Sequence, residues 1–243
     1  MLTHHYYIGN SNQPTATLER MLSADPKLPT IADQMNAAAK EVSLPWRICE
    51  TNSFSGGGKG GVSDTLGSAL WTLEFMYLLA AKGCAGVNME TGVNHLGFIS
   101  SYSPITDQRA GNLGVAPEYY GMLAFARGGR GRLVALDLDA GGLNLTAYAT
   151  RSDEGALLLT VINKEQSRDA VVNVSGFDRS RPAEVMRLTG PSARATDGVR
   201  FGDTAVDKAG AWQPRPASGV AVHDGRAMLA IPAASAAVIS LRA

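Results

Sequence analysis

The sequence predicts an α/β region over residues 1–129 followed by an all-β region over residues 130–243. In the first region, short apolar runs alternate with longer segments whose apolar residues recur at helical spacing, which is typical of parallel α/β structure. From residue 130 onward the hydrophobic period changes to two, and short runs are separated by turns, which favours an antiparallel β-sandwich. The chain is therefore expected to form two domains that meet near residue 129.

The α/β region is expected to contain three strands, at residues 2–8, 46–50 and 85–89. The expected helices are a short one opening at Thr15 or Thr17 and longer ones at 31–42, 65–81 and 118–126. Ser63 or Asp64 can cap the third helix, and Gly83 is a natural stop after it. Three parallel strands cannot close a barrel or cover both sheet faces, so their unpaired edges are expected to promote self-association.

The all-β region is expected to contain about eight strands. They correspond to the apolar runs at residues 133–138, 143–149, 156–162, 170–174, 183–188, 220–222, 228–231 and 236–241. This region shows no carboxylate pair, no nucleophile beside a base and no metal-ligand cluster in its sequence. We therefore expect a structural role for it, and we expect it to fold as a separate unit.

The composition excludes several function classes. Lys plus Arg and Asp plus Glu both number 22, so no net field favours nucleic acid or an anionic membrane. The two cysteines, Cys49 and Cys84, lack metal-ligand spacing and are expected to be buried thiols, and the four histidines supply no ligand set. No metal or cofactor is expected. No run is long enough for a transmembrane helix, and the first residues, LTHHYYIGN, resemble a strand rather than a signal peptide.

The most informative stretch is WRICETNSFSGGGKGGVS, residues 46–63. It places a single carboxylate, Glu50, at the end of a strand and before a glycine-rich loop and a helix. Parallel α/β structures carry their chemistry at such strand ends, although a lone glutamate after a strand is more often a solvated loop residue. The loop is not a phosphate loop, because Lys59 is followed by two glycines and a valine before Ser63.

Several motifs together resemble the β-glucuronidase and heparanase enzymes of glycoside hydrolase family 79. They are THHYY, RICETNSFSGGGKGGVSDT, GVNMETG, YSPI, APEYYGML and LTAYATRSDEGALLLTVINK. The resemblance covers most of the chain. It implies a (β/α)8 barrel, of which this chain holds about strands six to eight, followed by a β-sandwich, and retaining hydrolysis of β-linked glucuronic acid.

The resemblance also implies roles for individual residues. Glu50 matches the family's nucleophile, and Tyr6 matches the tyrosine that orients it; the alternative for Tyr6 is a core aromatic. The substrate-binding residues that the resemblance implies are His4, Asn52, Gly56, Gly57, Gly58, Lys59 and Tyr102. Among them, the backbone N–H groups of the three glycines are expected to receive the uronate carboxylate.

The family's proton donor follows an asparagine on the fourth barrel strand, and this chain begins after that point. The isolated chain is therefore expected to be inactive, although the complete protein is expected to be a glycosidase with a glucuronic-acid-containing carbohydrate as substrate. The alternative is a non-catalytic remnant or a carbohydrate-binding or structural module. Endo-cleavage of a sulfated polysaccharide is disfavoured, because Lys59 is the one basic residue in the three loops of the expected cleft. A secreted or periplasmic location is implied by the resemblance alone.

Overall fold

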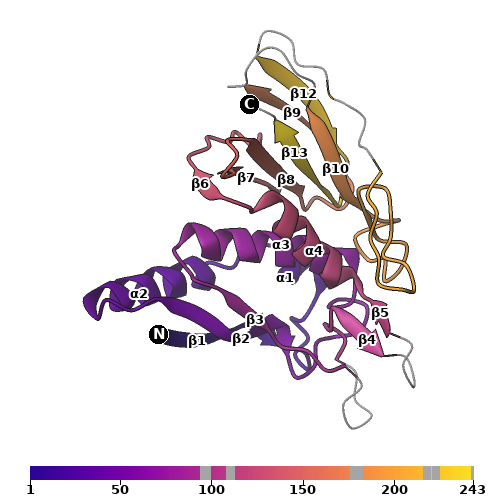
Figure 1. The fold of residues 1–243 in the computed structure, drawn as a ribbon. Helices are drawn as coiled ribbons and strands as arrows, with labels where there is room; N and C mark the ends of the chain where they lie inside the picture. The colour runs from indigo at the N-terminus through magenta and orange to yellow at the C-terminus, as the bar shows by residue number, and fades with distance from the viewer. Residues whose placement is uncertain (94–99, 108–112, 176–182, 216–219, 221–224, 242–243) are drawn as a thin grey trace.

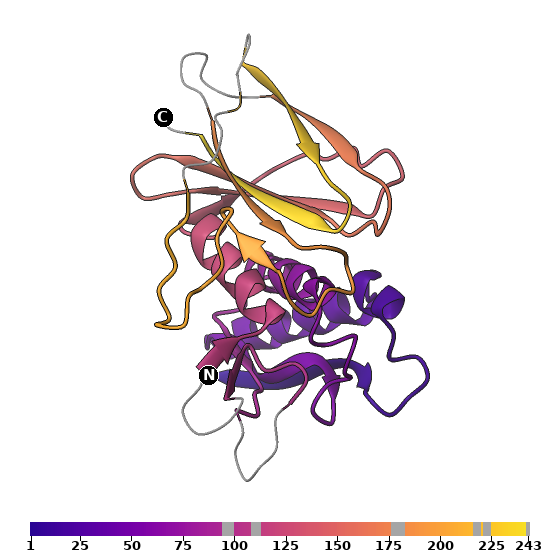
Figure 2. The same ribbon diagram turned by 90° about the vertical axis from the view of Figure 1, so that its right-hand side faces the viewer.

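The computed structural model describes residues 1–243 except 94–99, 108–112, 176–182, 216–219, 221–224 and 242–243. A parallel sheet lies on one side of the molecule, antiparallel strands lie on the other, and helices lie between them (Figure 1). A view turned by 90° shows the same order of layers (Figure 2). The expected combination of α/β and all-β structure is therefore present in the described part of the chain.

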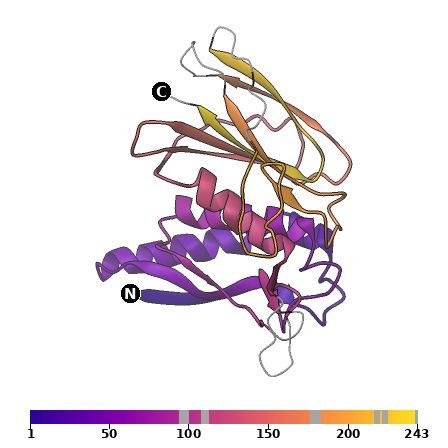
Figure 3. The same cartoon turned by 45° about the vertical axis from the view of Figure 1, so that its right-hand side comes forward.

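The parallel sheet contains β1 (Leu2–Asn10), β2 (Trp46–Ser55) and β3 (Val87–Met89), in the spatial order β1-β2-β3. Both pairings are parallel, as the alternation of strands and helices predicts. The strand β2 extends five residues beyond the predicted end, so that Glu50 lies within the strand rather than at its end. The C-terminal ends of the strands meet at one edge of the sheet, where the short hairpin of β4 (Ile105–Asp107) and β5 (Leu113–Val115) also lies (Figure 3).

Within the described residues, four helices accompany this sheet: α1 (Leu18–Leu22), α2 (Lys27–Glu41), α3 (Leu66–Ala81) and α4 (Pro117–Gly128). The helix α2 begins four residues before its predicted start and contains Pro29, which its first turn accepts because the N–H groups there have no partner within the helix. The predicted cap of α3 is wrong. The cap residue is Thr65, without a side-chain hydrogen bond, and the first N–H groups of α3 donate instead to the carbonyl oxygens of Ala193 and Ala195.

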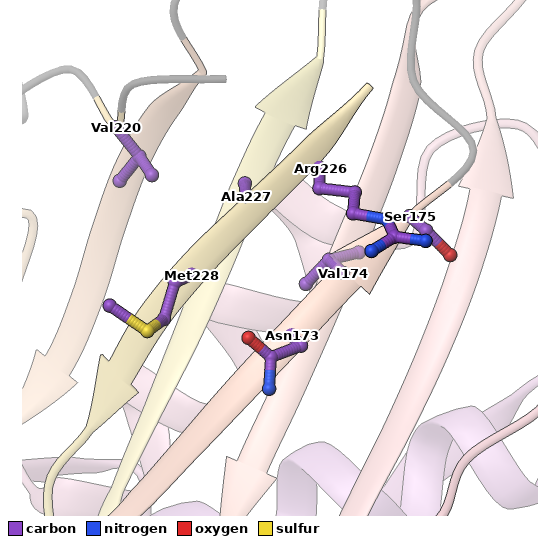
Figure 4. Close-up of a pocket in the computed structure, with 7 residues that line it drawn as sticks. All are labelled: Asn173, Val174, Ser175, Val220, Arg226, Ala227 and Met228. Atoms are coloured by element: carbon purple, nitrogen blue, oxygen red, sulfur yellow. The ribbon is translucent and has the colours of Figure 1, made fainter. Parts of the chain in front are cut away.

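The antiparallel strands form a six-stranded sheet in the order β11-β10-β13-β8-β7-β6, and a separate pair of β9 and β12. Their bounds are β6 Arg132–Val134, β7 Leu145–Arg151, β8 Leu157–Asn163, β9 Ala170–Ser175, β10 Glu184–Thr189, β11 Arg200–Phe201, β12 Arg226–Ile231 and β13 Ser235–Leu241. Most of the predicted run at 220–222 lies outside the described residues; Val220 itself forms an isolated bridge with Ala183. A cavity of about 650 Å³ lies at the β9–β12 pair, on the side of the molecule opposite the parallel sheet (Figures 1 and 4).

One hydrophobic core joins the two predicted domains. Leu70 and Tyr77 of α3 belong to the same cluster as Ile162 and Val238 of the six-stranded sheet. The hydroxyl of Tyr77 is also 2.7 Å from the Thr160 hydroxyl across this boundary. The helix α3 is buried on nearly all sides, so other elements must pack against each of its faces. A second cluster of buried residues, which includes Leu159, Val185 and Ile239, lies entirely within residues 130–243. The boundary near residue 129 and the separate folding of residues 130–243 both remain predictions.

The two cysteines differ from the expectation of buried thiols. Cys49 and Cys84 are both free thiols, and both are partly exposed rather than buried. Within the described residues, no group of three or more His, Cys, Asp or Glu side chains could hold a metal ion. None of the helices described is long and apolar enough to cross a membrane.

Candidate active site

An irregularity in β2 decides which way Glu50 points. His4 of β1 pairs with Ile48 of β2, but the next residue, His5, pairs with Glu50, so Cys49 is an extra residue in β2. The pairing of β2 with β3 shows the same interruption, because it shifts between Ile48 and Thr51. A bulge of this kind reverses the alternation of side chains. Ile48 is consequently fully buried in the core, whereas Glu50, two residues later, is on the other face of the sheet.

Two side chains of β1 hold the Glu50 carboxylate. The hydroxyl of Tyr7 donates a hydrogen bond of 3.0 Å to Glu50 Oε1, and Nδ1 of His5 lies 3.5 Å from Glu50 Oε2. The Glu50 side chain is 44% exposed, so it remains accessible to a ligand. Burial, followed by the hydrogen bond to Glu50, raises the pKa of Tyr7 far above its usual value, so Tyr7 keeps its proton and remains a donor.

The expected contact between Tyr6 and Glu50 is not the one observed. Tyr6 is 4% exposed on the opposite face of β1, where its hydroxyl donates to Asp25 Oδ2 at 2.7 Å and its ring stacks on Phe75. His4 shares that face because strand side chains alternate, so neither residue of the predicted pair faces Glu50. The pair that faces it is His5 and Tyr7, one residue further along.

A second carboxyl group, Glu90, follows β3 and belongs to the same cluster. Tyr102 is almost fully buried, and its pKa is raised by this burial and then by hydrogen bonding and charge from Glu90. The charge of Glu90 also raises the pKa of Tyr7. Within the described part of the chain, Oε2 of Glu90 is buried without a hydrogen-bond partner. The predicted residue Tyr102 therefore belongs to the same polar cluster as Glu90 and Tyr7.

Asn52 is buried, and its side chain contacts the segments that carry this cluster. It is 1% exposed, and its Nδ2 lies within hydrogen-bond distance of the carbonyl oxygens of Glu90 (3.1 Å) and Tyr102 (3.4 Å) and of the carboxyl oxygens of Glu118 (3.1 and 3.3 Å). The expectation that Asn52 binds substrate directly is therefore wrong for this structure. The residue ties α4 to the loops that carry Glu90 and Tyr102, and Glu118 is a site-supporting residue that sequence reasoning missed.

The glycine-rich loop is tightly packed against Tyr102. Gly56, Gly57 and Gly58 have φ of +83°, +88° and +75°, and a Cβ on Gly58 would lie 2.8 Å from Tyr102 Cδ1. The N–H of Gly58 donates to the Phe54 carbonyl, and the Gly57 carbonyl accepts from the N–H of Ser101. One of the three expected donors is therefore engaged within the loop, and the role of the other two in binding a uronate remains a prediction.

Lys59 closes the same loop through its backbone. Its N–H donates to the Ser63 hydroxyl at 3.0 Å, and the Ser63 hydroxyl is 2.9 Å from that of Ser53. The side chain of Lys59 is partly exposed and forms no ion pair with any residue that the structure describes. Its predicted role in binding an anionic sugar thus remains a prediction.

The buried carboxyl of Glu118 makes stability depend on pH. Burial raises the pKa of Glu118 well above its usual range, and the hydrogen bond from Asn52 only partly opposes this. An unfolded glutamate ionises near pH ~4.3, whereas folded Glu118 keeps its proton to higher pH, so stability falls as pH rises above that value. Glu118→Gln is therefore expected to raise the melting temperature at about pH 8 and to change it little at about pH 4. The exposed Glu41→Gln is the control, and an equal effect of Glu118→Gln at both pH values would contradict the account.

Comparisons with known proteins identify sequences that are similar to this chain. It is 31% identical over 172 residues to a β-glucuronidase of Aspergillus niger, a match that covers 66% of this chain and 31% of the relative. It is 30% identical over 128 residues to a β-glucuronidase of Neurospora crassa, which covers 50% of this chain and 22% of the relative. The chain thus spans about a third or less of these relatives. No family model matches it.

Solved structures show the same fold. A 4-O-α-L-rhamnosyl-β-D-glucuronidase from Fusarium oxysporum 12S superposes with a TM-score of 0.77 at 20% identity, covering 98% of this chain and 52% of that one. A GH51 arabinofuranosidase from Xanthomonas axonopodis pv. citri superposes with a TM-score of 0.68 at 17% identity, covering 99% and 52%. These structures show the fold, and the two curated relatives confirm the predicted resemblance to β-glucuronidases.

Proposed function

We propose that this β-glucuronidase-like chain is the C-terminal part of a retaining glycoside hydrolase that acts on β-linked glucuronides, with Glu50 as its nucleophile. In this proposal β1, β2 and β3 are strands six to eight of a (β/α)8 barrel, and the antiparallel strands form the β-sandwich domain that follows. The observation that carries it is the bulge at Cys49, which turns Glu50 to the face where Tyr7 and His5 hold its carboxylate.

The chemistry assigns one task to each group. Glu50 attacks the anomeric carbon and forms a glycosyl ester, while a second carboxyl group about 5–5.5 Å away protonates the leaving oxygen and later activates water. The Tyr7 hydroxyl stabilises the negative charge of Glu50 and fixes its orientation. We place the proton donor outside these 243 residues, in the additional length that the relatives possess.

Two observations test this assignment. The coding sequence upstream of Met1 should encode about five further strand and helix units with an Asn-Glu pair, and the two parts together are called the complete enzyme below. The 243-residue chain alone should not hydrolyse an aryl β-glucuronide, because a proton donor contributes on the order of 10²–10⁴ in rate. Turnover by the purified chain alone would contradict the proposal that the proton donor lies outside these 243 residues. The absence of upstream units would favour the non-catalytic alternative.

Tyr7 and Tyr6 provide a matched pair of variants. In the complete enzyme, Tyr7→Phe is expected to lower kcat about 10- to 100-fold, because it removes a hydrogen bond to a charged group. Tyr6→Phe removes the bond to Asp25 on the opposite face, so it is expected to lower the melting temperature and to leave kcat nearly unchanged. A larger loss of kcat in Tyr6→Phe than in Tyr7→Phe would restore the role that the family resemblance gives to Tyr6.

A further inference from the structure

Asn52 lies next to the two residues that form the Glu50–Tyr7 hydrogen bond. It follows Glu50 by two positions in β2, a distance of about 7 Å along a strand. It also pairs with Tyr7 across β1 and β2, in the same register that pairs His5 with Glu50. Because the two strands are hydrogen-bonded at this point, a shift of Asn52 also shifts Glu50 and Tyr7.

The amide group of Asn52 binds the two segments that complete the polar cluster. Its Nδ2 lies 3.1 Å from the Glu90 carbonyl oxygen and 3.4 Å from the Tyr102 carbonyl oxygen. The N–H of Glu90 also donates to the Thr51 carbonyl at 2.8 Å, so Glu90 is joined to β2 through both its N–H and its carbonyl group. Asn52 therefore holds both segments against the end of β2.

Glu118 of α4 fixes the orientation of this amide group. Its two carboxyl oxygens lie 3.1 and 3.3 Å from Asn52 Nδ2, and both residues are 1% exposed. The Thr72 hydroxyl of α3 lies close to the same carboxyl group. A buried amide keeps the orientation in which its hydrogen-bonding groups have partners, because water cannot replace a partner that is lost. The orientation of Asn52 thus depends on Glu118.

The carboxyl group of Glu118 has no neighbouring cation to stabilise a negative charge. In the part of the chain that the structure describes it forms no ion pair, and the charge that acts on it is that of Glu90, which has the same sign. Burial and this like charge raise the pKa of Glu118. Ionisation at alkaline pH therefore places an uncompensated charge beside Asn52 and the Glu90 segment, which costs free energy unless the segment moves away.

We propose that Glu118 is a positioning residue for the Glu50 chemistry, and that through Asn52 it holds the segments that carry Glu90 and Tyr102 against β2. The proposal rests on the proposed function, since it assigns these segments to the site of a glycosidase. The neutral carboxyl group is the form that holds them, so the site loses its geometry as Glu118 ionises. Glu118 acts through Asn52 rather than on the reacting atoms.

Hydrogen exchange in the 243-residue chain tests this role without requiring turnover. The amides to follow are those of Glu90 and of Ser101, whose N–H donates to the Gly57 carbonyl at 2.7 Å. After correction for the intrinsic exchange rate, the opening constant of both amides is expected to rise at least about tenfold between about pH 5 and about pH 9. In Glu118→Gln, whose side chain stays neutral, it is expected to change less than about twofold.

Two controls separate positioning from general stability. Glu41→Gln, at an exposed glutamate of α2, is expected to keep the rise of about tenfold. The amides of β13 in the unsubstituted chain are expected to rise less than those of Glu90 and Ser101. An equal rise in β13 would mean that Glu118 acts on overall stability alone, and it would overturn the proposal. The same rise in Glu118→Gln as in the unsubstituted chain would also overturn it.

Kinetics of the complete enzyme test the consequence for catalysis. The substrate is β-D-glucuronyl fluoride, because fluoride departs without a proton donor and the titration of the donor then does not affect kcat/KM. From about pH 6 to about pH 9, kcat/KM is expected to fall at least about tenfold in the unsubstituted enzyme and less than about twofold in Glu118→Gln. His5, Tyr7 and Glu50 are common to both proteins, so the difference between the two profiles reports on Glu118.

The two experiments distinguish the possible failures. Superposable pH profiles of kcat/KM for the two enzymes would overturn the role of Glu118 in catalysis. If the complete enzyme hydrolyses no glucuronide while the exchange difference persists, the proposed function fails, but Glu118 still holds these segments. If glucuronides are hydrolysed and the exchange of Glu90 and Ser101 does not depend on Glu118, the positioning proposal fails and the proposed function stands.

Discussion

Glu50→Gln is expected to abolish turnover of an aryl β-glucuronide by the complete enzyme, with kcat lowered by at least about 10⁴-fold. An amide cannot form the glycosyl ester, so the covalent route is closed. The fold should be kept, because the Glu50 side chain is 44% exposed and the amide oxygen of glutamine can still accept the hydrogen bond from Tyr7. Steady-state kinetics together with a thermal melt separate loss of chemistry from loss of structure.

The control for this variant is Asp33→Asn. Asp33 is also a partly solvated carboxylate, 61% exposed, and it pairs with Lys82 rather than with any residue that contacts Glu50. Its substitution is expected to leave kcat unchanged. Activity of Glu50→Gln close to that of the unsubstituted protein would remove Glu50 from the role of nucleophile.

Lys164→Ala is expected to destabilise the chain by about 3 kcal/mol, as is typical when one partner of a buried ion pair is removed. The Lys164 side chain is 2% exposed, and its Nζ lies 2.5 Å from Glu74 Oε2 on α3. This pair crosses from the antiparallel sheet to the helical layer, so its loss leaves Glu74, which is 17% exposed, without its counter-charge inside the shared core. Chemical denaturation of the 243-residue chain measures the change.

The matched control is Lys82→Ala, which breaks the pair with Asp33. Both of these side chains are substantially exposed, at 36% and 61%, so the expected loss is below about 1 kcal/mol. Similar losses for the two variants would mean that the Lys164 pair contributes no more than a surface pair. Two separate unfolding transitions in the unsubstituted chain would show that the regions before and after residue 129 do not unfold as one unit.

Local patterns predicted the main elements because the information lies within each segment. The apolar runs in β1 and β2 and the apolar spacing in α3 were sufficient to place these elements within a few residues. Glu50 could likewise be singled out, since a carboxylate between an apolar run and a glycine loop is visible in the sequence. The combination of parallel α/β and antiparallel structure followed from the change of hydrophobic period after residue 129.

The partners of Glu50 could not be predicted, because they depend on pairing between strands. The period of β1 left two possible faces, His4 with Tyr6 or His5 with Tyr7, and only the bulge at Cys49 decides between them. No local signal marks a bulge whose extra residue is a cysteine rather than a glycine. The hydroxyl of Tyr6 donates to Asp25, which lies 19 positions further along the chain, so the sequence alone did not show that Tyr6 has a partner on the other face of β1.

Contacts between segments that are far apart in the sequence could not be predicted either. Asn52 and Glu118 are separated by 66 positions, and a glutamate in the first turn of a helix is ordinarily solvated. The hairpin of β4 and β5 has strands of three residues each, which is too short to show a period. The first N–H groups of α3 are satisfied by Ala193 and Ala195, more than 100 residues away, so no local capping residue was needed.

The most direct test of the central claim is to identify the residue that becomes covalently attached to substrate. Treatment of the complete enzyme with 2-deoxy-2-fluoro-β-D-glucuronyl fluoride should trap the glycosyl ester, because fluoride departs without a proton donor while the C2 fluorine slows hydrolysis of the ester. Peptide mass spectrometry is predicted to find the fluoroglucuronyl group on Glu50. Its attachment to another carboxylate, such as Glu90, would contradict the assignment of the nucleophile.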